Sequence, residues 1–172
     1  MFKTLSFGIG VALAVCAPML TALAEPEPKQ IGAFNGWTAF AYTEGKEQVC
    51  YVLGRPKTSE PKTARRDEIY LTVTHRRMAK VRAEVALHLG YALKEKSTVD
   101  AAVGPTKFAL FVREDSAWAP DAKTDKALAD AMAGGRSLEV KGVSARGTAT
   151  TDIYELQGFA QALKAIDAAC PP

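Results

Sequence analysis

Three residue types that can form a nucleophile–base–acid triad occur in the chain, but their sequence contexts do not support one. Ser144, His75 and Asp152 have the side chains that a serine hydrolase uses. Ser144 lies in GVSARG rather than in a G-x-S-x-G elbow, and His75 ends a predicted strand without a local motif that would orient it. His88 falls on the polar face of a predicted strand, where we expect a solvated imidazole. We therefore predict no catalytic residues.

Carboxylates, metal ligands and phosphate-binding loops give no stronger signal. No two carboxylates stand out as the acid and nucleophile of a glycosidase. Asp152 and Glu155 in DIYE are more simply explained as a helix capping box than as a site. The chain has no C-x-x-C motif, its two histidines are scattered, and it has no glycine-rich phosphate loop. We therefore predict no metal and no cofactor.

The strongest local charge bias is basic. It occurs in ARRDEIYLTVTHRRMAKVR, where two predicted strands form a hairpin through HRRMAK and gather cations at its ends. A solvated rim of ordinary charges is the simpler interpretation. Because arginine binds phosphate and carboxylate groups well, the alternative is a surface for an anionic envelope partner: a lipid headgroup, a lipopolysaccharide phosphate or an acidic protein. The candidate residues are Arg65, Arg66, Arg76, Arg77, Lys80 and Arg82.

Other motif residues are candidates of unknown role. In SARGTATTD, Gly147 permits a turn or a close backbone approach, and the threonines suit a strand. We interpret Arg146 and Asp152 as candidates for a structural ion pair or for hydrogen bonds to the backbone. Tyr154 follows in the same motif. Of the two tryptophans, Trp118 is the better candidate for a partly exposed contact, because it precedes a loop that contains proline.

The N-terminal segment predicts export. Residues 1–24 combine a positively charged start, a short apolar run and an A-L-A cleavage signal, which is typical of a secretory signal peptide. A lipoprotein signal ending in LAVC would instead attach lipid to Cys16, but the valine before it fits such a cleavage poorly. We expect a flexible leader over residues 25–31 and a single β-rich domain over residues 25–172, with no transmembrane segment in the mature chain.

Export to the periplasm puts the remaining cysteines in an oxidising compartment. Cleavage leaves Cys50 and Cys170, which we predict to form a disulfide. Cys170 continues the helical stripe of Phe159, Leu163 and Ile166, so the bridge would pin a terminal helix to an early strand and close a ring of about 120 residues. Nucleic acid is disfavoured by this compartment, and the net charge of +3 is too small to argue for it.

Most of the mature chain is predicted to form strands. Residues 80–93 alternate apolar and polar side chains, the two-residue period of a strand with one buried face. Further strands are predicted in GWTAFAYT, EQVCYVLG, DEIYLTVTH, TKFALFVRE and RSLEVKGV. Helices are predicted near residues 124–133, with Thr124 as N-cap, and near residues 157–168. We therefore expect a mainly β protein: an antiparallel sandwich or flattened barrel of at least six strands, with one short helix and a C-terminal helix packed on it.

Taken together, these segments resemble one protein family. GWTAFAY, VCYVLGRP, ARRDEIYLTVTHR, GYAL, KFALFVREDSAW and VSARGTATTDIYELQGFAQAL occur in the order found in the invasion-associated locus B family. The resemblance implies an exported, periplasmic or surface-associated β-rich domain, and it includes a late cysteine. It assigns no catalytic residues, and the link with host-cell invasion in its name is phenotypic.

Two classes of function follow. The favoured class is a non-catalytic periplasmic binding or interaction protein that supports envelope integrity or host contact. Its partner would be an envelope component or another protein. The alternative is a periplasmic, hydrolase-like enzyme whose site is spread over strand ends.

Overall fold

One continuous antiparallel sheet bends around two helices. The computed structural model describes residues 27–172, so the predicted signal peptide and Cys16 lie outside the described residues. Eleven strands follow the spatial order β1-β2-β3-β5-β6-β9-β8-β7-β10-β11-β4. They are β1 (Lys29–Phe34), β2 (Trp37–Glu44), β3 (Glu47–Gly54), β4 (Thr58–Glu60), β5 (Tyr70–Arg76), β6 (Val81–His88), β7 (Thr98–Val103), β8 (Thr106–Arg113), β9 (Ser116–Trp118), β10 (Ser137–Val143) and β11 (Ala149–Glu155).

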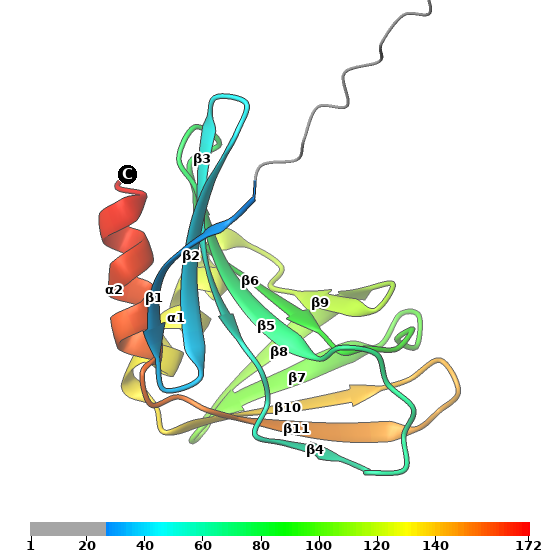
Figure 1. Ribbon diagram of the computed structural model, residues 1–172. Coiled ribbons are helices and arrows are strands. Elements are labelled where there is room, and N and C mark those ends of the chain that lie inside the picture. The colour runs from blue at the N-terminus through cyan, green and yellow to red at the C-terminus, as the bar shows by residue number, and fades with distance from the viewer. Residues whose placement is uncertain (1–26) are drawn as a thin grey trace, which may run out of the picture.

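The sheet is open, because its end strands β1 and β4 do not pair with each other. In Figure 1, β1 to β3 stand upright on the left, β5 and β6 cross diagonally, and β7, β8, β10 and β11 run across the base. Helix α1 (Ala122–Gly134) packs mainly on β6, and α2 (Phe159–Ala169) packs on β1, β2 and β3. A mainly antiparallel β fold with a C-terminal helix is therefore confirmed, and it is built from one bent sheet.

The inner face of this sheet supplies most of the core. Val52 in β3 lies opposite Val73 in β5, which lies opposite Val85 in β6, and all three are fully buried. Burying each such side chain contributes about 1.5–3 kcal/mol. The predicted two-residue period is present, but β6 ends at His88, earlier than expected. The chain turns there because Gly90 adopts a left-handed conformation with φ of 71°.

Helix α2 completes the core with its apolar face. Phe159 and Ile166 are fully buried, and Trp37 packs edge-to-face on Phe159 with 4.9 Å between ring centroids. The helix begins after Gly158, which has φ of 92° and lies so close to the Phe34 carbonyl that a Cβ would collide with it. No helix within residues 27–172 is both long enough and apolar enough to cross a bilayer.

Three details differ from the sequence prediction. The DIYE segment is not a capping box, because its residues belong to β11 and α2 starts only at Phe159. The N-cap of α1 is Asp121 rather than Thr124: the Asp121 carboxylate accepts a hydrogen bond of 2.7 Å from the Thr124 N–H, which lowers the pKa of Asp121. Residues 29–31, expected in a flexible leader, belong to β1, which pairs with β2.

The C-terminal end of α2 is tied to the sheet. The predicted disulfide between Cys50 and Cys170 is present, with 6.0 Å between their Cα atoms. Gln48 Nε2 donates a hydrogen bond of 2.8 Å to the Ala169 carbonyl, and the Arg82 guanidinium donates to the Cys170 carbonyl. These donors satisfy carbonyls that a helix leaves unpaired at its end. The positive charge of Arg82 also interacts favourably with the negative end of the helix dipole.

Candidate functional site

A polar hollow lies where three connecting segments meet. They are the β4–β5 connection, the β6–β7 connection and the β10–β11 turn, which Figure 1 shows on the right-hand side of the molecule. The hollow has a volume of about 670 Å³, within the range of roughly 300–1,000 Å³ typical of ligand sites. These segments carry the ARRD, GYAL and SARGTATTD motifs. The lining consists of residues 63–67, residues 90–92, residues 144–146, Thr148 and Thr150.

A buried ion pair forms the floor of the hollow. Arg66 Nη1 and Nη2 donate to Asp152 Oδ1 and Oδ2 at 2.7 and 2.6 Å, and Arg66 Nε donates to the Leu89 carbonyl at 2.9 Å. The Arg66 and Asp152 side chains are only 5% and 1% exposed. Burial of two charges is tolerated when two hydrogen bonds join the pair and further hydrogen bonds support it, and here each of the three guanidinium nitrogens has an acceptor. Asp152 therefore forms a structural ion pair, as predicted, but its partner is Arg66 and not Arg146.

Local geometry explains how this pair forms. Asp152 and Tyr154 alternate with outward residues along β11 and are buried on its inner face. The β4–β5 connection approaches because the Asp67 N–H donates to the Gly90 carbonyl at 2.8 Å. A Cβ on Gly90 would lie 2.6 Å from the Asp67 carbonyl oxygen, so only glycine permits this contact. This close approach of the β4–β5 connection places Arg66 beside Asp152.

Two phenol groups near the pair are neutral hydroxyls. The Tyr91 ring lies 4.9 Å from the guanidinium carbon of Arg66, and its hydroxyl is 2.5 Å from Thr150 Oγ1. Burial raises the pKa of Tyr91, and the Thr150 hydrogen bond and the Arg66 charge partly oppose the rise. Burial raises the pKa of Tyr154 strongly, and the Asp152 charge adds to this. Neither phenol ionises near neutral pH, so each acts as a hydrogen-bonding group.

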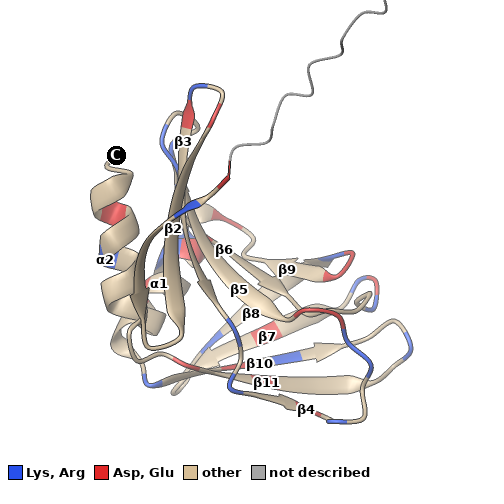
Figure 2. Cartoon of the chain, in the orientation of Figure 1, with Lys and Arg blue, Asp and Glu red and all other residues tan. Residues whose placement is uncertain are grey.

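The rim of the hollow carries two guanidinium groups without carboxylate partners. Arg65 and Arg146 are exposed and line the hollow, and neither forms an ion pair within residues 27–172. In Figure 2, basic residues mark both the β4–β5 connection and the β10–β11 turn. Ser144 Oγ accepts a hydrogen bond of 3.1 Å from the Thr148 N–H. The rim thus offers cationic and hydroxyl groups to a ligand.

The six cations proposed from the sequence do not form one surface, because three of them pair with carboxylates of the same chain, one pair buried and two partly exposed. Those pairs are Arg66–Asp152, Arg76–Glu84 and Arg82–Asp167. Arg77 and Lys80 are exposed at the turn between β5 and β6, whereas Arg65 lines the hollow. The basic residues noticed in the sequence therefore fall into three groups. Arg66, Arg76 and Arg82 form ion pairs, Arg77 and Lys80 lie at the β5–β6 turn, and Arg65 lines the hollow.

The residues of the imagined hydrolase triad have unrelated partners. His75 is 2% exposed, and its Nδ1 accepts a hydrogen bond of 3.0 Å from the Ala83 N–H. Nε2 therefore carries the hydrogen and donates to Asp167 Oδ1 at 2.9 Å, which links the sheet to α2. Ser144 and Asp152 lie at the hollow. Within residues 27–172, no three His, Cys, Asp or Glu side chains gather in a way that could hold a metal ion.

Comparison with known proteins agrees with the sequence motifs. Residues 37–167 match the family described as Invasion associated locus B (IalB) protein. The chain belongs to this family. The crystal structure of invasion associated protein B from Bartonella henselae has the same fold as this IalB-family chain, with a TM-score of 0.58 and 16% sequence identity. The similarity covers 85% of this chain and 97% of that chain. No curated protein sequence matches the chain.

Two parts of the site in this IalB-family protein were missed by sequence reasoning. Tyr91 and Thr150, which contact each other in the wall of the hollow, were not proposed as site residues. A signal near Tyr91 was available, because a glycine inside a strand pattern often marks a bend or a close backbone approach, and Gly90 directly precedes Tyr91. Trp118 lies elsewhere, half-buried in β9, and Trp37 is only 2% exposed.

Proposed function

We propose that this protein is a non-catalytic, exported envelope protein that binds a phosphate- or carboxylate-bearing envelope component at the hollow. The observation that carries this proposal is the position of Arg65 and Arg146, which line the hollow from two different connections and have no carboxylate partner in the part of the chain that the structure describes. Arg66 adds no net charge because Asp152 neutralises it. Even with Asp67 in the lining, the rim keeps an excess of positive charge.

The polar groups of the hollow suit binding better than turnover. Tyr91 and Thr148 add hydrogen-bonding groups beside the two guanidinium groups, which is the combination that recognises anionic oxygens. Ser144 accepts from a backbone N–H and has no base beside it, and none of the described lining residues is a histidine. A nucleophile without a neighbouring base is weak at neutral pH.

Export to the periplasm is part of the same proposal. Residues 1–24 have the pattern of a signal peptide, and a disulfide such as Cys50–Cys170 forms most readily in an oxidising compartment. The family description and the name of the Bartonella henselae protein both refer to invasion. We extend this to a role in envelope integrity or host contact, in which the hollow holds the anionic partner.

The proposal is tested by calorimetric titration of residues 25–172 with lipopolysaccharide and, as a small probe, with inorganic pyrophosphate. Binding should saturate and should weaken as the salt concentration rises, because salt screens this attraction. Replacing Arg65 and Arg146 together by serine should lower the affinity roughly tenfold or more. The matched control replaces Arg77 and Lys80, which removes the same charge from the exposed β5–β6 turn and should leave the affinity unchanged.

The outcomes separate the possible explanations. An equal loss in both double variants would mean unspecific charge attraction, and a loss only in the turn variant would move the site to the hairpin. Either result contradicts binding at the hollow. Release of inorganic phosphate from pyrophosphate, abolished by one substitution, would favour the periplasmic enzyme instead.

A further inference from the structure

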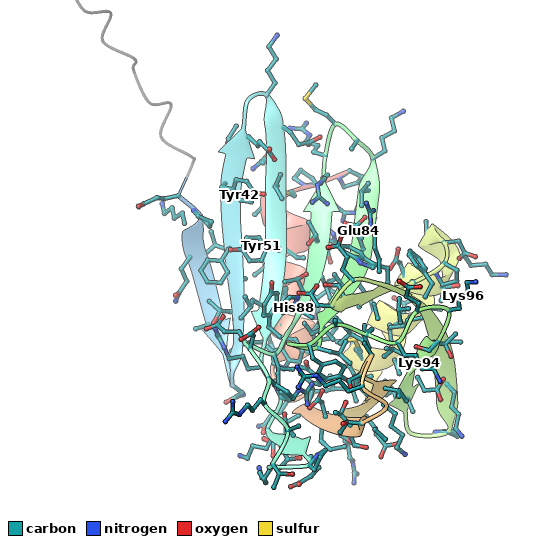
Figure 3. The ribbon with its side chains drawn as sticks, turned by 90° about the vertical axis from the view of Figure 1, so that its right-hand side faces the viewer. Tyr42, Tyr51, Glu84, His88, Lys94 and Lys96 are labelled. Atoms are coloured by element: carbon teal, nitrogen blue, oxygen red, sulfur yellow. A yellow bond between two sulfur atoms is a disulfide. The ribbon has the colours of Figure 1, made fainter. Side chains whose placement is uncertain are left out.

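A second groove, lined by residues of β5, β6, β8, β9 and the start of α1, combines aromatic and charged side chains. It has a volume of about 450 Å³, which also falls within the range of roughly 300–1,000 Å³ for ligand sites. It shares no lining residue with the hollow. Figure 3 shows this side of the molecule, with Glu84 on β6 facing the viewer. The lining residues that matter here are Arg76, Glu84, Phe111, Arg113, Trp118 and Asp125.

Two aromatic side chains on neighbouring strands line this groove. Phe111 of β8 is directly opposite Trp118 of β9, so the two side chains lie on the same face of the sheet. Phe111 is 46% exposed, and the only other large apolar side chain so exposed within residues 27–172 is Met78. An exposed ring contributes little to the core, whereas a pair of rings offers a flat apolar platform to a ligand.

Four charged groups surround the platform. Arg76 Nη1 donates to Glu84 Oε1 at 2.9 Å, while Arg113 has no ion-pair partner among the described residues. Asp125 reaches the groove from α1 and is only 9% exposed. Its Oδ1 accepts a hydrogen bond of 2.8 Å from the Val85 N–H, and its Oδ2 has no hydrogen-bond partner within residues 27–172. No buried side-chain nitrogen or oxygen of the described residues lacks a partner, so Oδ2, which has none, is open to solvent and to a ligand.

The charges of the groove indicate the kind of ligand. Its two guanidinium and two carboxylate groups cancel, so a simple anion or cation would meet repulsion as well as attraction. A sugar ring fits both features: its C–H face packs on aromatic rings, and its hydroxyls donate to carboxylates and accept from guanidinium groups. We propose that this groove binds a neutral carbohydrate, with a sugar ring over Phe111 and Trp118 and its hydroxyls on Asp125 and Arg113.

Tryptophan fluorescence offers a direct test on residues 25–172. The probes are soluble neutral tetrasaccharides of glucose and of N-acetylglucosamine, in both α- and β-linked forms where they exist. Because Trp37 is 2% exposed, a ligand-induced change reports on Trp118. We expect a saturable change with at least one probe and little dependence on salt. Phe111→Ala should weaken that binding roughly tenfold, without unfolding the protein, since the ring is exposed.

A second variant separates ligand binding from stability. Asp125→Asn keeps the shape of the side chain and the bond from Val85, but it removes the carboxylate acceptor Oδ2. We expect roughly tenfold weaker binding together with undiminished resistance to urea. The matched control is Tyr42→Ala, which removes an aromatic ring of β2 outside the groove and should leave the affinity unchanged (Figure 3).

Three results would overturn the proposal. The first is no saturable binding of any neutral probe. The second is binding that survives both Phe111→Ala and Asp125→Asn. The third is binding of charged saccharides alone with strong salt dependence. The variant lacking the guanidinium groups of Arg65 and Arg146 should still bind carbohydrate, so failure of this site and failure of the hollow are distinguishable.

Discussion

Arg66 and Asp152 form a two-point ion pair between the β4–β5 connection and the inner face of β11, across 86 residues of sequence. Both side chains are almost excluded from solvent, so each charge relies on the other for compensation. Arg66 also binds the Leu89 carbonyl and lies against the ring of Tyr91. This one guanidinium therefore holds together the segments that surround the hollow.

Removing one partner of this pair should be strongly destabilising. Asp152→Asn leaves the buried charge of Arg66 uncompensated, and we expect a loss of about 3–5 kcal/mol in the free energy of unfolding, measured by urea denaturation. Arg65→Ser, at the exposed neighbouring position, should change stability by no more than about 0.5 kcal/mol. The double variant Arg66→Met, Asp152→Leu should recover much of the loss. This account would be contradicted if the double variant lost as much free energy of unfolding as Arg66→Met and Asp152→Leu lose together when made singly.

A comparison of two glycines tests the close contact beside the ion pair. Gly90 and Gly104 both have positive φ, at 71° and 55°, but only Gly90 lies against another backbone segment. Gly104→Ala should show the conformational penalty alone, about 1 kcal/mol. Gly90→Ala should be clearly less stable than Gly104→Ala, because the β4–β5 connection must move. Equal urea midpoints for the two variants would show that the approach of Asp67 to Gly90 is not required.

Loss of the disulfide should destabilise the protein and loosen α2 first. In the chain-entropy model, a ring with a sequence separation of 120 contributes roughly 4–5 kcal/mol. Cys170→Ser should show a loss of this order, and a reductant should reproduce it in the wild type without further effect on the variant. Because α2 still buries Phe159 and Ile166 without the bridge, its end should loosen before the whole protein unfolds, which would appear as faster hydrogen exchange there. Mass spectrometry of unreduced periplasmic protein that finds two free thiols would refute the bridge.

The carboxyl group of Asp125 should oppose folding at neutral pH. Burial raises its pKa above the ordinary value of 3.8, and the charges of Glu84 and Asp121 add to the rise, although the Val85 hydrogen bond opposes it. The folded protein therefore binds this proton more tightly than the unfolded chain does. The Asp125 carboxyl therefore stabilises the folded protein most below pH 3.8, and this stabilisation is lost as the pH rises through the raised pKa.

Asp125→Asn is uncharged at every pH and isolates this effect. At neutral pH the variant should be at least as stable as the wild type, and the difference should shrink in acid, where both side chains are neutral. Urea midpoints of the two proteins, measured at neutral pH and below pH 3.8, decide the point. A stabilisation that appears only in acid would contradict the predicted direction.

The parts of the fold that sequence reasoning predicted well are those with local patterns. The alternation that places Val73 and Val85 on one face is visible within each strand, and the stripe from Phe159 to Ile166 is visible within one helix. The cysteine pairing followed from the predicted export, from the two cysteines left after cleavage and from the place of Cys170 on the helical stripe, and the family resemblance added a late cysteine. Strands of three residues, such as β4 and β9, are too short to show a period and were not predicted.

The floor of the hollow depends on where the sheet bends, which no local pattern shows. The motif SARGTATTD makes Arg146 and Asp152 candidates for an ion pair or for hydrogen bonds to the backbone, and it points to no partner outside itself. The actual partner, Arg66, reaches Asp152 only because Gly90 admits the β4–β5 connection. Asp152 and Tyr154 are two residues apart in β11 and so lie on the same face of the strand. If that face is buried, the Asp152 carboxylate is buried too, and a buried carboxylate requires a cation.

The bond between Cys50 and Cys170 encloses both proposed ligand sites within one covalent loop. A protease that cuts any peptide bond inside this loop leaves a nicked molecule whose two pieces remain attached. Among single cuts, only one before Cys50 or after Cys170 releases a fragment. A fragment from before Cys50 would carry β1, β2 or the first residues of β3, and one from after Cys170 would carry only the final prolines. A surface loop such as the β10–β11 turn can therefore be cleaved without dispersing the molecule, and on an unreduced gel such damage would leave the apparent mass unchanged.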